Sequence, residues 1–159
     1  MVSAFINDAN YVSSTNIANN YYSKAQINEI FNILENKMPK DYTKDYLTIE
    51  SIDDDNEILW SHFESGSPQK IIFVSVDGGV NWTQYTSSAL GTVLGTLNRG
   101  DKILIKGLNQ SYGTSAKFAY FYTTYRVNVY GNIMSLIYGD SFSDKTTLTT
   151  NYTFVKLFQ

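Results

Sequence analysis

The stretch 71-IIFVSVDGGVNWTQY-85 carries the clearest fold signal in this chain of 159 residues. Residues 71–76 are mainly apolar and β-branched, a composition typical of a strand on a half-buried, pleated surface. The Asp-Gly-Gly sequence at 77–79 then supplies turn residues, because glycine adopts positive φ and aspartate bonds to nearby amides. The stretch therefore predicts a β-hairpin whose second strand covers residues 80–85.

Short strand-like segments separated by turn residues continue on both sides of this hairpin. Strands this short and this regularly spaced indicate an antiparallel sandwich or barrel. We therefore predict a mainly β fold, an antiparallel β-sandwich of jelly-roll or immunoglobulin-like type, over residues 40–159. The predicted strands cover residues 46–52, 57–63, 71–76, 80–85, 102–106, 118–130, 133–138 and 152–158.

The composition suits a sheet-rich core and narrows the classes of partner. Aromatic residues make up 15% of the chain and charged residues 17%, a balance that favours packed, pleated surfaces. The net charge of −3 offers nothing to neutralise phosphates, so we predict no nucleic-acid partner. No stretch approaches the roughly 20 apolar residues of a membrane span, so we predict no membrane partner. The absence of cysteine excludes a disulfide scaffold, a thiolate zinc site and a cysteine nucleophile.

One helix is predicted ahead of the β region, over residues 21–38. Ser23 and Gln26 have the spacing of a capping box, in which each side chain accepts a hydrogen bond from the other residue's amide. Pro39 ends the pattern, because proline removes an amide donor and restricts the residue before it. These signals define both ends of the helix.

The apolar side chains of this helix fall on one stripe, for which two explanations remain open. Either the stripe packs against the β domain of the same chain, or it mediates self-association as a short coiled coil with heptad spacing. We favour the second and assign residues 21–39 as an oligomerisation helix that forms a homotrimer. The residues assigned to self-association are Ile27, Ile30, Phe31 and Leu34.

Residues 1–20 are rich in Asn, Ser and Ala and show no sustained period. They lack the basic start and the continuous apolar run of a secretory signal. One interpretation is a disordered tail, and the other is an arm that becomes ordered on a partner surface. We predict a docking arm in which the scattered apolar side chains are the anchors. These anchors are Phe5, Ile6, Tyr11 and Val12.

Four residues of the hairpin form the pattern Ser-x-Asp-x-Gly-x-x-Trp, namely Ser75, Asp77, Gly79 and Trp82. This pattern resembles the Asp-box, a β-hairpin motif found in sialidases and in many other β proteins. The resemblance implies a structural role, in which the Asp bonds turn amides and the Trp packs beside the hairpin. Sialidases also need several blades and an arginine cluster. This chain has one such box and two arginines, so we predict no glycosidase activity.

Other patterns with catalytic or metal-binding associations have structural explanations. The Arg-Gly-Asp tripeptide at 99–101 predicts a β-turn, and the alternating acids at 53–57 lack the glycine and distal glutamate of a calcium loop. The single histidine, His62, lies in a strand pattern beside aromatic residues, which favours a structural side chain over a general base. We therefore predict no enzyme activity, no catalytic residue, no cofactor and no metal site.

The longest predicted strand, over 118–130, has two different faces. One face is expected to join the core, because apolar residues alternate along it. The other is aromatic at one end and polar at the other. It either packs in a second layer or subunit interface, or forms an exposed aromatic platform for sugars or a partner. The core face comprises Ala119, Phe121, Thr123, Tyr125, Val127 and Val129, and the second comprises Phe118, Tyr120, Tyr122, Thr124, Arg126, Asn128 and Tyr130.

Four segments, 46–50, 74–82, 98–107 and 131–142, together resemble the N-terminal β module of BspA-like surface proteins of Bacteroidales. The resemblance covers residues 46–158 and not the leucine-rich repeats that typically follow in those proteins. It implies, as one possibility for function, a secreted bacterial surface module for adhesion or glycan binding. A small glycan-active enzyme with paired carboxylates is a further class.

The start of the predicted helix, YYSKAQI at 21–27, resembles a helix start common near the N-termini of phage fibre proteins. Together the two resemblances imply a virion protein of a Bacteroides phage of the crAss-like group. The role they imply is structural, a head fibre or capsid decoration at the capsid surface. Its partners would be further copies of itself, the major capsid protein or other virion proteins, and host or mucosal glycans.

Overall fold

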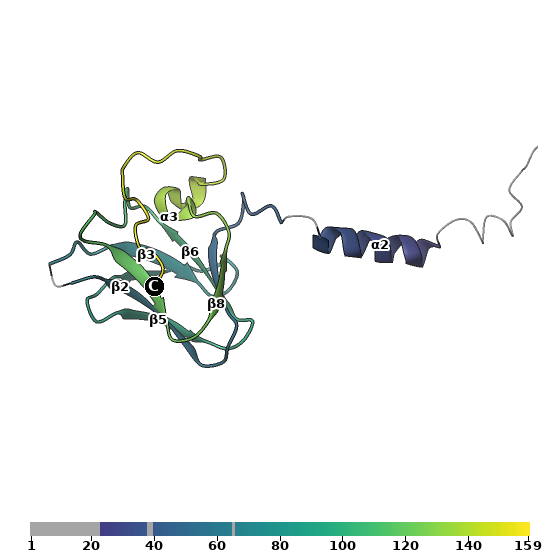
Figure 1. Cartoon of the computed structure of the whole chain (residues 1–159), viewed down its shortest axis with the longest axis horizontal. Helices are drawn as coiled ribbons and strands as arrows, with labels where there is room; N and C mark the ends of the chain where they lie inside the picture. The colour runs from purple at the N-terminus through teal and green to yellow at the C-terminus, as the bar shows by residue number, and fades with distance from the viewer. Residues whose placement is uncertain (1–22, 38–39, 65) are drawn as a thin grey trace, which may run out of the picture. The chain divides into compact units, whose positions relative to one another are not determined.

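The structure is a computed structural model and describes residues 23–37, 40–64 and 66–159. The chain divides into two compact units, one ending at Lys40 and the other spanning Asp41–Gln159. The second unit consists of two layers of strands with a short helix at one end, visible in Figure 1. No helix in the described ranges has the length and apolar character needed to cross a membrane.

Helix α2 (Lys24–Lys37) begins with the predicted capping box. The Ser23 amide donates to Gln26 Oε1 over 2.8 Å, and the Gln26 amide donates to Ser23 Oγ over 3.2 Å. This reciprocal pair satisfies two amides at the start of the helix that have no partner within it. The predicted helix is therefore confirmed, while Pro39 and residues 1–22 lie outside the described part of the chain.

The larger sheet contains five strands in the order β4-β3-β6-β1-β8, and each neighbouring pair is antiparallel. Ile72 and Val74 of β3 are buried, and so are Ile103 and Ile105 of β6. This period of two turns one apolar face of the sheet toward the core and leaves a mixed face outward. The strands are β1 (Leu47–Ser51), β3 (Ile71–Ser75), β4 (Thr83–Thr86), β6 (Lys102–Gly107) and β8 (Val127–Tyr130).

The smaller sheet contains three antiparallel strands in the order β5-β2-β7. The central strand β2 carries Ile58 and Trp60 into the core, and its pairing with β5 shifts register between Ile58 and Leu59. The two sheets form the antiparallel β-sandwich that the sequence predicts (Figure 1). The strands are β2 (Asn56–His62), β5 (Thr92–Leu97) and β7 (Ala119–Thr123).

The core is centred on Trp60, whose side chain is fully buried. Its ring centroid lies 4.5 Å from that of Phe121 and 5.6 Å from that of Tyr112. The Trp60 Nε1–H donates to the carbonyl of Lys70 over 2.8 Å, so the one polar group of the indole is satisfied. Burial of the apolar side chains of the whole core, of which Trp60 is one, is the main favourable contribution to folding of the sandwich.

The strand predicted over 133–138 is wrong, because this segment forms helix α3 (Ser135–Tyr138), which is followed by the short 3₁₀ helix η1 (Gly139–Ser141). Ser135 is buried against β6, where its Oγ donates to the carbonyl of Ile105 over 2.8 Å. Periodicity does not separate a short apolar strand from one buried helical turn. Packing against the sheet therefore decided the conformation of this segment.

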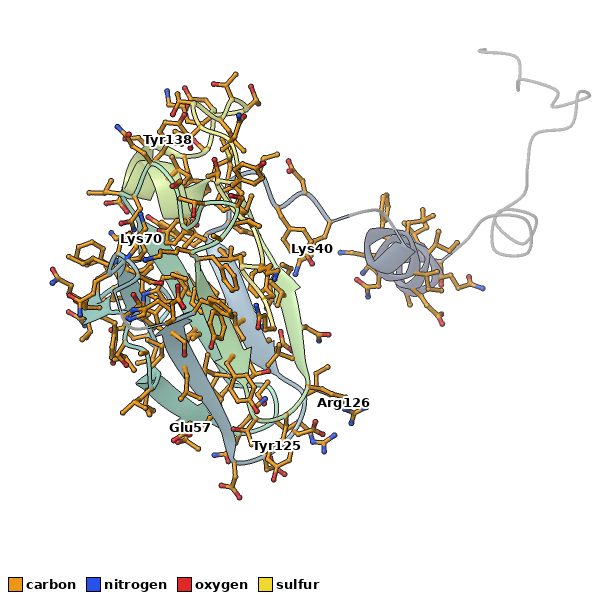
Figure 2. The ribbon with its side chains drawn as sticks, turned by 60° about the vertical axis from the view of Figure 1, so that its left-hand side comes forward. Lys40, Glu57, Lys70, Tyr125, Arg126 and Tyr138 are labelled. Atoms are coloured by element: carbon orange, nitrogen blue, oxygen red, sulfur yellow. The ribbon has the colours of Figure 1, made fainter. Side chains whose placement is uncertain are left out.

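The single strand predicted over 118–130 is two strands in different sheets. β7 pairs with β2 in the smaller sheet, whereas β8 pairs with β1 in the larger one. Between them the buried side chain of Asn56 accepts the Tyr125 amide over 2.9 Å and donates to the Arg126 carbonyl over 3.1 Å. Figure 2 shows Tyr125 and Arg126 at the end of the sandwich opposite Tyr138.

The predicted strands differ from the structure in three further places. Residues 152–158 form turns rather than a strand, with positive φ of 58° at Tyr152 and 49° at Lys156. Strand β5 has no predicted counterpart, because Gly95 interrupts its apolar pattern. The second strand of the hairpin starts only at Thr83, because the turn is longer than predicted. The remaining predicted strands agree with β1, β2, β3 and β6 to within one residue at each end.

Candidate functional site

The hairpin between β3 and β4 is held by hydrogen bonds around Asp77. The Ser75 hydroxyl donates to Asp77 Oδ1 over 2.7 Å and accepts the Gly79 amide over 2.8 Å. Asp77 Oδ1 also accepts the amides of Val80 and Asn81, over 3.1 and 2.9 Å. These bonds, led by that from the Asn81 amide, stabilise the carboxylate and lower the pKa of Asp77 to about 2. Asp77 is therefore ionised at neutral pH.

The same hairpin places Trp82 on the outer face of the larger sheet. The Trp82 Nε1–H donates back to the Gly79 carbonyl over 3.0 Å, which fixes the orientation of the indole. Lys106 Nζ lies 4.1 Å from the centroid of the indole ring, and the Tyr46 ring lies 4.9 Å away in an edge-on arrangement. A cation over a ring face is attracted by the ring quadrupole. Trp82 therefore connects the hairpin to strand β6.

Lys106 and Asp140 form the charged centre of this outer face. Lys106 Nζ lies 2.7 and 3.0 Å from the two carboxylate oxygens of Asp140, and the Tyr46 hydroxyl donates to Asp140 Oδ1 over 2.7 Å. Burial, reinforced by this bond to Asp140, raises the pKa of Tyr46 to about 12. Hydrogen bonds from Lys106 and Tyr46 lower the pKa of Asp140. Lys106 is therefore paired with an ionised carboxylate at neutral pH.

Two adjoining hollows on the same face form a groove, which we call the β3–β6 groove. Their volumes are about 370 and about 270 Å³, and Phe73 and Leu108 line both. Phe73 stands between Gln84 on β4 and Lys106 on β6, which are its register partners on either side. The other lining side chains are Ile71, Trp82, Asn109 and Asp140.

The groove combines aromatic rings with a few polar groups, which is the composition of ligand-binding sites. Its titratable side chains, Lys106 and Asp140, are paired with each other. Asp140 is the one carboxylate among the described residues that line the groove. Glycoside hydrolysis normally requires two carboxyl groups flanking the bond to be broken. The groove therefore has the composition of a ligand-binding site and presents one carboxylate to a ligand.

The other titratable residues that the sequence singles out have structural contacts. His62 is buried, with Nδ1 3.1 Å from Ser87 Oγ. Asp53 pairs with both arginines, at 3.1 Å from Arg126 and 4.0 Å from Arg99. The described ranges contain no group of three or more His, Cys, Asp or Glu placed to hold a metal ion.

The aromatic face predicted on 118–130 is not one surface, because β7 and β8 belong to different sheets. Phe118 is buried, whereas Tyr122 is 48% exposed. The predicted core face also breaks up after β7, because Tyr125 and Val129 are exposed. Of the two alternatives for this face, a single exposed platform is not formed, because its residues are divided between two sheets and Phe118 is buried. The aromatic groove lies elsewhere, on β3, β4 and β6.

The side chains assigned to self-association lie on α2 and are exposed. The exposed fractions are 41% for Ile27, 39% for Ile30, 59% for Phe31 and 50% for Leu34. The residues assigned to docking lie outside the described residues. These are Phe5, Ile6, Tyr11 and Val12.

The sequence gives little indication that Phe73, Lys106 and Asp140 form one site. Strand predictions at 71–76 and 102–106 assign no face to Phe73 or Lys106, although alternation with buried neighbours places both outward. Asp140 has no sequence signal, because it follows a segment predicted as a strand and observed as α3.

Comparisons with known protein families, with curated proteins and with solved structures gave no match. The function is therefore inferred from the residues and their geometry.

Proposed function

We propose that this chain is a non-enzymatic structural protein of a virion, a head fibre or capsid decoration. It forms a homotrimer through α2 and displays the β-sandwich at the capsid surface. The observation that carries the proposal is the exposed apolar stripe of α2. Ile27, Ile30, Phe31 and Leu34 are each between 39% and 59% exposed. Contiguous exposed apolar side chains of this size mark interaction surfaces.

Three considerations favour further copies of the chain as the cover of this stripe. A helix of 14 residues is marginal on its own in water, so its stability has to come from packing. A second copy offers the same stripe, and most oligomers are symmetric assemblies of one chain. Ile27 and Ile30 stand at a and d spacing, and isoleucine at both positions favours more than two strands.

The length of α2 limits the strength of such an assembly. At a rise of about 1.5 Å per residue, the 14 residues span about 21 Å, or two heptads. Burying one Ile or Leu side chain contributes roughly 1.5–3 kcal/mol, against an association cost of about 4–15 kcal/mol. The trimer is therefore expected to depend on protein concentration.

The capsid setting is supported by the resemblance of residues 21–27 to the helix start of phage fibre proteins. In this setting residues 1–20 dock on the major capsid protein or another virion protein. The docking anchors are Phe5, Ile6, Tyr11 and Val12. Neighbouring genes for capsid and portal proteins are the expected genomic context.

Light scattering of the full chain after size-exclusion chromatography tests the proposal. The wild-type mass is expected to approach three times the 18.0 kDa mass of the chain as the concentration rises. Ile30→Asp places a charge in the stripe and is expected to give the monomer mass. Asn32→Asp adds the same charge on the opposite side of α2 and is expected to keep the wild-type mass. A monomeric wild type, or equal masses for the two variants, would contradict self-association through α2.

A bacterial surface module for adhesion or glycan binding is the second candidate, and the β3–β6 groove favours it. Its aromatic and polar lining suits a ligand whether or not the chain is part of a virion. A monomeric mass together with glycan binding would support this candidate over the first.

A further inference from the structure

We propose that the β3–β6 groove binds an uncharged oligosaccharide. One sugar ring stacks on Phe73, and neighbouring rings reach the Lys106–Asp140 pair on one side and Gln84 with Asn109 on the other. The inference deepens the display role by naming the site and the ligand class. It relies on that role only for its biological setting, because the groove is contained within one β-sandwich.

Phe73 provides the floor of the site. Its neighbours Ile72 and Val74 are buried in the core, whereas Phe73 lines both hollows of the groove. The buried core of the described residues does not include Phe73. A partly exposed aromatic ring with polar neighbours offers a flat apolar face that matches the C–H face of a pyranose. Trp82 adds a second aromatic wall at the hairpin side.

The Lys106–Asp140 pair supplies a donor and an acceptor at one end. Asp140 is 67% exposed at its side chain, so its carboxylate remains open to a ligand hydroxyl. An ammonium group has three N–H donors, and the two bonds to Asp140 leave one for a ligand. Sugar hydroxyls both donate and accept, so vicinal hydroxyls fit this pair of opposite groups.

Gln84 and Asn109 supply amide groups at the other end. The Asn109 side-chain nitrogen donates to the Ile71 carbonyl over 2.6 Å and to the Tyr112 hydroxyl over 3.0 Å. These two bonds fix the amide plane and leave its carbonyl oxygen as an acceptor. Gln84 is exposed and makes no hydrogen bond through its side chain within the described part of the chain. Both amides are therefore placed to bind hydroxyl or acetamido groups.

Charge decides which glycans fit. Lys106 and Asp140 neutralise each other, and Lys106 is the one cation among the described residues that line the groove. A carboxylate or sulfate on a glycan would therefore meet the Asp140 carboxylate without an additional positive charge. Nucleic acid is disfavoured for the same reason. Two adjoining hollows suit a chain of sugars better than a single one.

A printed array of neutral, sialylated and sulfated oligosaccharides, probed with the labelled full chain, tests the ligand class. Binding is expected on neutral oligosaccharides and not on the charged forms of the same structures. Calorimetry with the best neutral oligosaccharide then tests the site. Phe73→Ala is expected to weaken binding about tenfold, because the stacking face is lost. Gln84→Ala, at an exposed position, is expected to weaken it by a smaller factor.

Tyr122→Ala is the matched control, because Tyr122 is an exposed aromatic residue on the smaller sheet. It is expected to bind like the wild type. An unchanged unfolding midpoint for Gln84→Ala separates loss of ligand contacts from loss of fold. The inference is overturned by an empty array, by a preference for charged glycans, or by Tyr122→Ala weakening binding more than Phe73→Ala. A change in mass with Phe73→Ala and no glycan binding would instead identify the groove as a contact between copies. Trimer formation is measured separately by light scattering, so the two proposals fail independently.

Discussion

Helix α2 and the β-sandwich differ in how far their apolar side chains are exposed. Ile30 of α2 is 39% exposed, whereas Ile49 and Ile103 of the sandwich are completely buried. The capping box of α2 joins residues three positions apart, whereas the Tyr130–Glu50 hydrogen bond of the sandwich joins residues 80 positions apart. The sandwich completes its core within one chain. The helix start is specified locally, and under the proposed function its stripe is covered by further copies of the chain.

The largest expected effect lies in the sandwich core. Trp60→Ala removes a fully buried indole, and such substitutions cost about 3–5 kcal/mol in free energy of unfolding. Chemical denaturation followed by near-ultraviolet circular dichroism measures this loss. Val80→Ala, at a side chain that is 78% exposed, is the control and is expected to change stability by less than about 0.5 kcal/mol. Equal stability of the two variants would show that this core does not hold the sandwich together.

A smaller effect is expected where the chain passes from one sheet to the other. Asn56→Ala leaves the Tyr125 amide without its buried acceptor, whereas the Arg126 carbonyl keeps a hydrogen bond from the Ile52 amide. An unpaired group of this kind costs about 1–3 kcal/mol, so we expect a loss of about 1–3 kcal/mol in the same denaturation experiment. Asn128→Ala removes an exposed amide from β8 and is expected to have little effect. A similar loss for both variants would mean that the Asn56 contacts do not secure this crossing.

A substitution in the capping box tests whether α2 can be destabilised without an effect on the β-sandwich. Ser23→Ala removes one of its two hydrogen bonds and is expected to destabilise α2 by about 1 kcal/mol. Far-ultraviolet circular dichroism should show less helix, and sedimentation equilibrium should show weaker association. The free energy of unfolding of the sandwich is expected to stay unchanged. A fall in sandwich stability would show that the two units are coupled.

The smallest expected effect is a pH dependence at the hairpin. The pKa of Asp77 is about 2 in the folded chain, below its ordinary value of 3.8. A group whose pKa is lowered by folding stabilises the fold above its unfolded pKa, and this contribution is lost as the pH falls from about 3.8 to about 2. The thermal midpoint of the wild type should therefore fall more steeply across this window than that of Asp77→Asn. Parallel profiles would assign the acid sensitivity to other carboxylates.

The parts of the fold that were predictable are those that depend on neighbouring residues. Ser23 and Gln26 specify the start of α2, because the capping bonds form within one turn. Asp77 and the glycines after it specify the hairpin, because the turn bonds span four residues at most. Composition and spacing of short apolar segments were sufficient to predict a sandwich.

The errors lie where one local pattern suits more than one environment. The segment 133–138 is apolar enough for a strand, yet Ser135 is bonded to β6 and the segment closes into a helical turn. The stretch 118–130 alternates like one strand, yet its two halves, β7 and β8, belong to different sheets. Asn56 binds the Tyr125 amide at the point where the chain passes between them. Trp82 is the one residue of the candidate site that the sequence singled out, because it belongs to the hairpin motif.

The sequence by itself determined the helix start, the hairpin, the antiparallel β class and the apolar stripe of α2. Each follows from hydrogen bonds or periodicities that span a few residues. Tertiary structure alone decided which strands share a sheet, and it alone brought Phe73, Lys106 and Asp140 into one groove. The physical reason is that these three residues belong to segments far apart in the chain. Their proximity results from strand pairing and from the packing of α3 on β6, which local propensity does not encode.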